Sequence, residues 1–228
     1  GHIAANFITH KLLEPPFLCL LVSGGHTSIV NVLGYNRFDI ICSTVDDAVG
    51  ESFDKVARVL GLPYPGGPQI DMLAKQGKPS VKLPSPLIQS GNFSYSGLKT
   101  AVINYLHNKE QKGEEFSVAD VAAGFQQAVV DVLAEKAVSS ARMLDQGRIV
   151  LAGGVAANSA LKRQMKEEAE KSNIRVLFPP PVLCTDNAAM IACAGYYRLR
   201  KGDLSDLSLN AVPNVPLSKV SLPAMDSR

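Results

Sequence analysis

The first part of the chain alternates short apolar runs with turn residues. Residues 17–22 are almost wholly apolar, and residues 27–33 and 38–42 form two further runs rich in apolar and β-branched side chains. Ser23-Gly24-Gly25-His26 separates the first run from the second, and Gly34-Tyr35-Asn36 separates the second from the third. Short runs bounded by turn residues predict three β-strands joined by tight turns.

From Asp46 the spacing of apolar positions becomes that of a helix. One face carries only apolar side chains, and Gly61 stands where a C-terminal cap is expected; the face consists of Val49, Phe53, Val56, Ala57 and Leu60. Residues 62–115 are rich in Pro, Gly, Lys and Ser. We therefore expect a β-β-β-α unit followed by an insertion of loops around short helices.

After residue 115 the chain alternates helix and strand. A helix is expected to start after Ser117, with Asp120 as its capping-box partner, and to run to Leu144. The further elements expected are a strand over 148–152, a helix over 158–171, a strand over 175–178 and a final helix over about 185–200. Such alternation predicts parallel strands with helical crossovers. The polar tail after Lys201 is expected to fray.

Composition places the chain among globular domains. It has 228 residues, of which 46% are hydrophobic and 19% charged, and its net charge of +2 neither favours nor excludes contact with RNA. The four cysteines show no C-x-x-C spacing, which argues against a zinc ribbon or a disulfide framework and fits a reducing cytoplasm. We see no apolar run long enough to span a membrane and no signal leader, so we expect a cytoplasmic protein without membrane contact.

Two glycine pairs at strand ends are candidate anion-binding loops. The first follows a strand, in Leu21-Val22-Ser23-Gly24-Gly25, where a glycine backbone can approach an anion closely. An ordinary hairpin turn explains it equally well. The second, Gly153-Gly154, precedes a helix start at Asn158, where the helix dipole favours a phosphate, although Asn158 alone is better explained as an N-cap. Together the two turns suggest two loops closing on one nucleotide.

Several polar residues are further candidates. Asp46 and Asp47 are explained by the favourable interaction of acids with a helix start, whereas Asp54 and Asp71 flank the Pro-Gly-Gly-Pro loop and are placed to reach a ribose or an amine. Asp186 begins the final helix and has a plain alternative as its cap. The S-x-x-K spacing from Ser96 to Lys99 lacks the companion motifs of serine acyl-enzymes, so we give it little weight.

Six ordered motifs resemble those of the bacterial tRNA N6-adenosine threonylcarbamoyltransferases, a family once named glycoproteases. They are Leu21 to Thr27, Phe53-Asp54-Lys55, Tyr64 to Pro68, Phe93 to Val102, Ala152 to Asn158 and Cys184 to Ala188. The resemblance implies an α/β chain with the actin-like, sugar-kinase and heat-shock ATPase fold, in which two lobes enclose a nucleotide cleft. Residues 1–14 would lead out of a first lobe that is absent from this chain, and residues 15–228 would form the second lobe, with the insertion at about 62–115.

The resemblance also implies a reaction and a site. The family transfers a threonylcarbamoyl group from threonylcarbamoyl-adenylate to N6 of the adenosine beside the tRNA anticodon and releases AMP, with no covalent nucleophile. Leu21, Val22, Ser23, Gly24 and Gly25 would cradle the adenylate, Asp54, Gly67 and Asp71 would hold its ribose and adenine, and Asn158 would complete the site. His2, otherwise readable as a tag remnant, matches the second histidine of the family's H-x-x-x-H, and Asp186 matches its carboxylate ligand.

The implied cofactor is one divalent metal, with iron expected and zinc or magnesium as alternatives. The implied partners are tRNA, threonylcarbamoyl-adenylate, an actin-like paralogue and a small ATPase. Because only two of three protein ligands are matched, we expect this chain to be inactive by itself. Two other functions stay open, namely a nucleotide-binding lobe that only binds partners and another actin-like phosphotransferase such as a sugar kinase.

Overall fold

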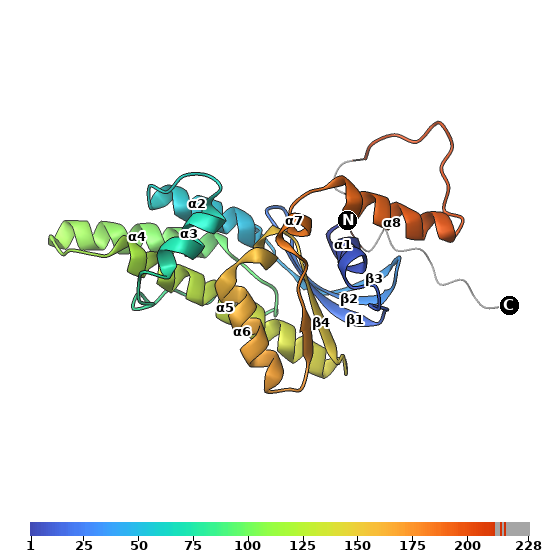
Figure 1. The fold of residues 1–228 in the computed structure, drawn as a ribbon. Helices are drawn as coiled ribbons and strands as arrows, with labels where there is room; N and C mark the ends of the chain where they lie inside the picture. Colours follow the sequence, from blue (N-terminus) through green and yellow to red (C-terminus); the bar gives the residue numbers. More distant parts are fainter. Residues whose placement is uncertain (213–214, 216, 218–228) are drawn as a thin grey trace.

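The computed structural model describes residues 1–212, 215 and 217, and its centre is one five-stranded sheet (Figure 1). The strands lie in the order β3-β2-β1-β4-β5, with bounds β1 (Phe17–Val22), β2 (Thr27–Gly34), β3 (Arg37–Ser43), β4 (Arg148–Ala152) and β5 (Arg175–Leu177). The first three are antiparallel, whereas β4 pairs in parallel with both β1 and β5. The three predicted N-terminal strands and the parallel pairing of the C-terminal half are confirmed.

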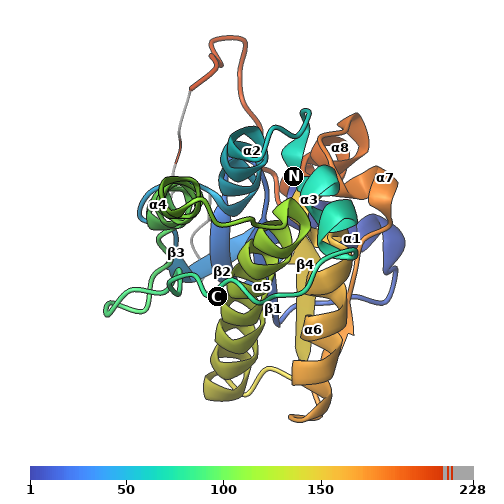
Figure 2. The ribbon, with the colours of Figure 1, turned by 90° about the vertical axis from the view of Figure 1, so that its left-hand side faces the viewer.

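Helices cover both faces of the sheet (Figures 1 and 2). They are α1 (His2–Thr9), α2 (Val49–Val59), α3 (Gly66–Ala74), α4 (Ser96–Lys112), α5 (Val118–Met143), α6 (Ser159–Glu170), α7 (Pro181–Cys184) and α8 (Ala188–Arg200), with a 3-10 helix η1 (Gly154–Ala157). One apolar core joins the sheet to α2, α5 and α6, and a second joins the opposite face to α1 and α8. Because both faces are covered, all six residues of β1 are buried, which explains its unbroken apolar sequence.

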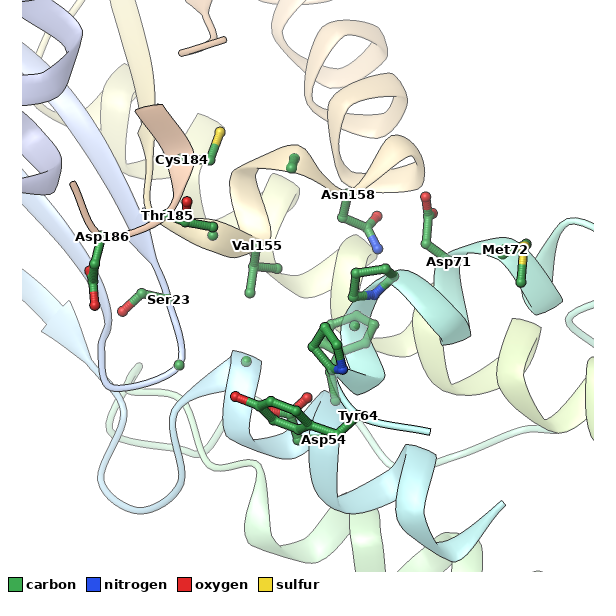
Figure 3. Close-up of a pocket in the computed structure, with 18 of the residues that line it drawn as sticks. Ser23, Asp54, Tyr64, Asp71, Met72, Val155, Asn158, Cys184, Thr185 and Asp186 are labelled. Atoms are coloured by element: carbon green, nitrogen blue, oxygen red, sulfur yellow. The ribbon is translucent and has the colours of Figure 1, made fainter. Parts of the chain in front are cut away.

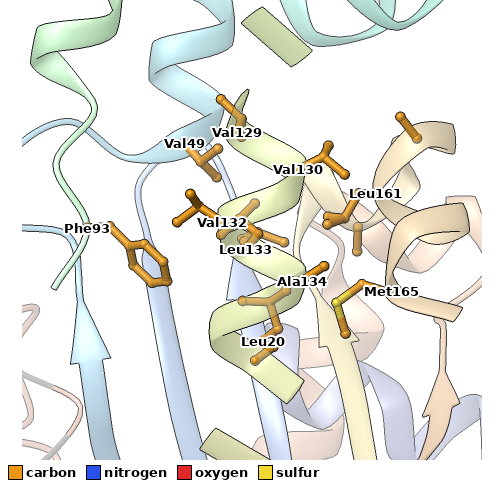
Figure 4. Packing of buried hydrophobic residues seen from close by; sticks show 14 of the residues in the cluster. Leu20, Val49, Phe93, Val129, Val130, Val132, Leu133, Ala134, Leu161 and Met165 are labelled. Atoms are coloured by element: carbon orange, nitrogen blue, oxygen red, sulfur yellow. The ribbon is translucent and has the colours of Figure 1, made fainter. Parts of the chain in front are cut away.

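The 26-residue helix α5 forms the middle of the larger core, which includes Val129, Val132 and Leu133 of the helix and Leu20 of β1 (Figure 4). Its predicted start is confirmed, since Ser117 Oγ accepts a hydrogen bond from the Asp120 backbone N–H at 3.2 Å. The capping box is only half formed. The Asp120 carboxylate turns away from Ser117 and accepts from the Lys78 backbone N–H at 2.8 Å, which ties the insertion to α5.

The insertion contains a longer helix than we expected. Helix α4 has 17 residues, and Asp46 fixes its start by accepting hydrogen bonds from Ser94 Oγ, the Tyr95 backbone N–H and Ser96 Oγ at 2.5, 2.7 and 2.8 Å. The assignment of Asp46 to the helix that follows it was wrong, because α2 begins only at Val49. The Ser96 hydroxyl is held by Asp46, so the S-x-x-K spacing forms no catalytic pair here.

Two predicted helix ends can be compared with the structure. Gly61 follows α2 with φ +73°, as its capping position requires. The last helix begins at Ala188 and not at residue 185, because Asn187 Oδ1 caps it by accepting from the Met190 N–H at 2.9 Å.

Residues 203–212 of the expected frayed tail contain no helix or strand, and most of the tail beyond them lies outside the described residues. Within the described residues, no helix combines the length and apolarity needed to cross a membrane.

Candidate functional site

A cavity of about 630 Å³ opens at the carboxyl ends of β1 and β4 (Figure 3). Its walls come from the start of α1, the turn after β1, α2, and α3 with the loop before it. The other walls are η1 with the start of α6, and the end of α7 with the segment that follows it. Ligands of open α/β sheets bind outside the carboxyl ends of parallel strands. The chain therefore has a formed cleft where its fold class places one.

The two glycine turns pack against each other at the base of this cleft. A Cβ atom on Gly153 would lie 2.3 Å from the carbonyl oxygen of Val22, and Gly153 has φ +94°. Gly50, at the start of α2, is also in close contact, since its Cβ would lie 2.7 Å from the Ser23 carbonyl oxygen, to which its N–H donates. The Gly153-Gly154 pair marked Gly153 in the sequence as part of a candidate loop, whereas no sequence pattern indicated a special role for Gly50.

The first glycine loop serves both as a hairpin turn and as a wall of the cavity. Ser23 Oγ accepts from the backbone N–H groups of Gly25 and His26 at 3.3 and 3.0 Å, so the turn satisfies two of its own donors. Ser23 and Gly24 line the cavity. Leu21 and Val22 are instead buried in the sheet and Gly25 is exposed, and none of these three lines the cavity.

Asp54 and Gly67 both reach the cavity, from α2 and α3 respectively. Asp54 Oδ1 accepts from the Gly66 backbone N–H at 2.7 Å, which holds the start of α3 against α2. At Gly66 a Cβ would come within 2.5 Å of the Ala57 side chain, whereas at Gly67 it would meet open space. The close approach of the two helices thus depends on Gly66, and Gly67 is the glycine that faces the cleft.

Asp71 and Asn158 meet at the start of α6. Asp71 accepts from Ser159 Oγ at 2.8 Å and from the Ser159 N–H at 3.3 Å, while Asn158 Oδ1 accepts from the Leu161 N–H at 2.9 Å. The N-cap interpretation of Asn158 is confirmed, and the residue also lines the cavity. Two first-turn donors that we had assigned to a phosphate already bind protein oxygens, so the helix start is less open to an anion than expected.

His2 and Asp186 lie together at one end of the cavity, with His2 Nε2 3.4 Å from Asp186 Oδ1. Burial lowers the pKa of His2 below its ordinary value, although the nearby Asp186 opposes that shift. Asp186 is not the cap of the last helix, since Asn187 caps it. Among the described residues, His2 Nδ1 is buried without a hydrogen-bond partner.

This pair suits a metal ion. A neutral imidazole and an exposed carboxylate 3.4 Å apart can share a cation at ordinary ligand distances of about 2.1 Å. Within the described part of the chain, no three His, Cys, Asp or Glu residues are grouped to hold a metal. In the described part of the chain, His2 and Asp186 are candidate donors for a metal as a pair.

Eight of the eleven predicted site residues line the cavity, namely His2, Ser23, Gly24, Asp54, Gly67, Asp71, Asn158 and Asp186. The sequence did not single out Tyr64, Lys75 or Cys184, which also line it. Tyr64 belongs to the Tyr-Pro-Gly-Gly-Pro motif, and an exposed aromatic side chain between prolines was a usable signal. Cys184 opens the motif from Cys184 to Ala188, whereas Lys75 carried no signal.

Comparison with known proteins identifies the family. The family model for tRNA N6-adenosine threonylcarbamoyltransferase (TsaD) matches residues 1–193. The chain belongs to this family. A tRNA N6-adenosine threonylcarbamoyltransferase from Clostridium perfringens strain SM101 is 56% identical over 222 residues, and one from Clostridium botulinum strain 657 is 51% identical. Each alignment covers 96% of this chain, which spans 66% and 65% of those two relatives.

Solved structures give the fold of this threonylcarbamoyltransferase-family chain. HypF in its phosphate- and nucleotide-bound form superimposes with a TM-score of 0.69 at 16% identity, covering 90% of this chain and 36% of that one. HypF from T. kodakarensis superimposes with a TM-score of 0.63 at 15% identity, covering 86% of this chain and 36% of that one. An activator of 2-hydroxyisocaproyl-CoA dehydratase from Clostridium difficile, with bound ADPNP, has a TM-score of 0.53 at 17% identity. The match covers 91% of this chain and 70% of that one. The expected actin-like α/β fold class is confirmed.

Proposed function

We propose that this chain provides the adenylate-binding lobe of an enzyme that transfers threonylcarbamoyl from threonylcarbamoyl-adenylate to N6 of the adenosine beside the tRNA anticodon. The proposal rests on one observation: residues from separate motifs of the family line a single cleft. A cavity of about 630 Å³ falls in the usual size range for small-molecule sites. We assign the phosphate to the side of Ser23 and Gly24, and the ribose and adenine to the side of Asp54, Gly67 and Asp71.

The reaction requires the protein to position the two reactants and does not require a nucleophile from the protein. The substrate is a mixed anhydride, so the exocyclic amine of adenosine attacks its carbonyl carbon, a new C–N bond forms, and the C–O bond to AMP breaks as the amine loses a proton. Holding the two reactants in place and keeping water away contribute most to such a step. The walls of the cleft, joined by Gly50 and Gly153 in close backbone contact, form a rigid frame for that purpose.

We propose that His2 and Asp186 hold one divalent metal ion. The 3.4 Å separation between His2 Nε2 and Asp186 Oδ1 fits a ligand pair. A bound divalent ion supplies Lewis-acid polarisation of a reacting oxygen. Iron is the ion that we expect, with zinc or magnesium as alternatives, and the other coordination positions belong to substrate, water or residues beyond this chain.

The remaining partners follow from the reaction and the family. We propose tRNA as the acceptor, an actin-like paralogue and a small ATPase as partner subunits, and the cytoplasm as the location. Because the described residues offer two metal donors, we expect the chain alone to transfer no threonylcarbamoyl.

Mass spectrometry of tRNA nucleosides tests the proposal. The full-length protein and its partner subunits, given unmodified tRNA and threonylcarbamoyl-adenylate, should produce N6-threonylcarbamoyladenosine, whereas this chain should not unless the rest of the enzyme is supplied. Turnover by the chain alone would contradict the inactivity. Nucleotide binding without transfer by the complete system would favour a binding module, and a phosphorylated sugar product would favour a phosphotransferase.

A further inference from the structure

Gln126 is an unusual residue on the buried face of α5. It is 6% exposed, and its buried neighbours along the helix include Ala122, Phe125, Val129 and Val130. A buried amide costs free energy unless its polar atoms find partners. The partner of Gln126 identifies its role.

That partner is Asn158 at the start of α6. Gln126 Oε1 accepts from Asn158 Nδ2 at 2.8 Å, and Asn158 Oδ1 accepts from the Leu161 N–H at 2.9 Å. Turning the Asn158 amide over would set its oxygen against Gln126 Oε1 and its NH₂ group against the Leu161 N–H. Both hydrogen bonds would be lost, so together they fix which way the amide points.

We propose that Gln126 is a positioning residue, which fixes the Asn158 amide so that its nitrogen offers a hydrogen-bond donor to the nucleotide in the cleft. Asn158 lines the cavity between Val155 and Asp71 (Figure 3), whereas Gln126 is not among the lining residues. The amide nitrogen carries two hydrogens, of which Gln126 takes one. The inference rests on the proposed function, because it assumes that an adenylate occupies this cleft.

A fixed donor at this position selects ligands with an acceptor. The ring nitrogens of adenine and the oxygens of ribose are acceptors, so an adenine nucleotide suits the Asn158 amide nitrogen. Asp71, 16% exposed at its side chain and bound to Ser159, holds the other side of the same helix start. Helix α6 is therefore anchored from α3 and from α5, and the donor direction is set before a ligand arrives.

Calorimetric titration of the full-length protein with AMP tests the inference. Asn158→Asp keeps the cap oxygen and removes the donor, so AMP affinity should fall about tenfold, with little change in melting temperature. Gln126→Met has similar length but no acceptor, and should also weaken AMP binding. In the Asn158→Asp background it should add almost nothing, because the donor is already gone. Ser140→Ala, a second buried polar site on α5, is the matched control and should leave AMP affinity unchanged.

Three results would overturn the inference. An equal loss of affinity from Gln126→Met in the wild-type and Asn158→Asp backgrounds would show a role that is only structural. Unchanged AMP affinity in Asn158→Asp would show that the Asn158 amide donates no hydrogen bond to AMP. This test remains available even if Gln126→Met fails to fold. No AMP binding by the wild-type protein would overturn the proposed function itself, which distinguishes that failure from the other two.

Discussion

At the scale of single residues, the acids that line this cavity also hold helix starts. Asp54 accepts from the Gly66 N–H at the start of α3, and Asp71 accepts from Ser159 at the start of α6. Asp46, outside the cavity, does the same for α4. A carboxylate that accepts from backbone N–H groups both satisfies free donors and opposes the positive end of the helix.

Acid should remove the contribution of Asp46 to stability. Partial burial acts to raise the pKa of this carboxyl, but hydrogen bonds from Ser94, Tyr95 and Ser96 outweigh burial and hold the pKa below its ordinary value of 3.8. A depressed pKa stabilises the fold above the unfolded-state value, and the gain is lost as pH falls through the folded-state pKa. Asp46→Asn should therefore lower the free energy of unfolding near neutral pH, and its deficit should shrink below about pH 4.

Urea unfolding from about pH 6 to about pH 3 measures this dependence. Asp39→Asn, at an exposed acid on β3, is the control and should cost little stability near neutral pH, because the side chain is exposed. A constant gap between wild type and Asp46→Asn across the whole range would contradict the prediction.

Asp186 and its neighbour Asn187 should separate metal binding from helix capping. Asp186→Asn in the full-length protein should reduce metal content and leave the melting temperature nearly unchanged, since Asn187 caps α8. Asn187→Ala should keep the metal content and lower the stability by about 0.5–2 kcal/mol, because it removes the cap of α8. Elemental analysis paired with thermal melting checks both, and a fully metallated Asp186→Asn protein would show that the ligand is misassigned.

At the scale of elements, the cleft depends on close packing between short segments. Helices α2 and α3 meet at Gly66, where a Cβ would come within 2.5 Å of Ala57 and 2.9 Å of the Asp54 Cα. The turns after β1 and β4 meet at Gly153 in the same way. At such contacts the absence of a side chain determines how near two elements can come.

Gly66→Ala and Gly67→Ala form a matched pair on one helix. Gly66→Ala should force α3 away from α2 and destabilise the protein by about 1–3 kcal/mol, as overpacking in a core does. Gly67→Ala meets open space and should keep the full stability, while its new methyl group narrows the cleft. Denaturant unfolding measures the stability of both variants. Equal stability would contradict the claim that α2 and α3 are in close contact at Gly66.

At the scale of the whole molecule, the packing of α1 against α8 brings His2 and Asp186 together. Helix α1 packs on α8, where Phe7 and Tyr197 have ring centroids 5.3 Å apart and Tyr197 stacks on Tyr35 at 4.0 Å. His2 starts α1 and Asp186 lies just before α8. The second apolar core therefore sets the distance between two residues that are 184 positions apart in sequence.

Phe7→Ala should damage this arrangement from a distance. Phe7 is 8% exposed, and removing a buried aromatic side chain costs about 3–5 kcal/mol. Because α1 carries His2, metal content should fall as well, although Phe7 does not line the main cavity. Ile8→Ala, on the same helix at 37% exposure, is the control and should change both properties much less. Full metal content in a folded Phe7→Ala protein would contradict the coupling.

The sequence by itself determined the local structure and the family. The strands at 17–22 and 148–152, the start of α5 at Ser117 and the cap at Gly61 follow from apolar spacing and turn chemistry, which act within a few residues. Only the tertiary structure decided the partners of the polar groups. Asp46 binds Ser94 and Ser96, and Gln126 binds Asn158. Each pair is far apart along the chain, so its contact depends on how whole elements pack, which local spacing does not encode.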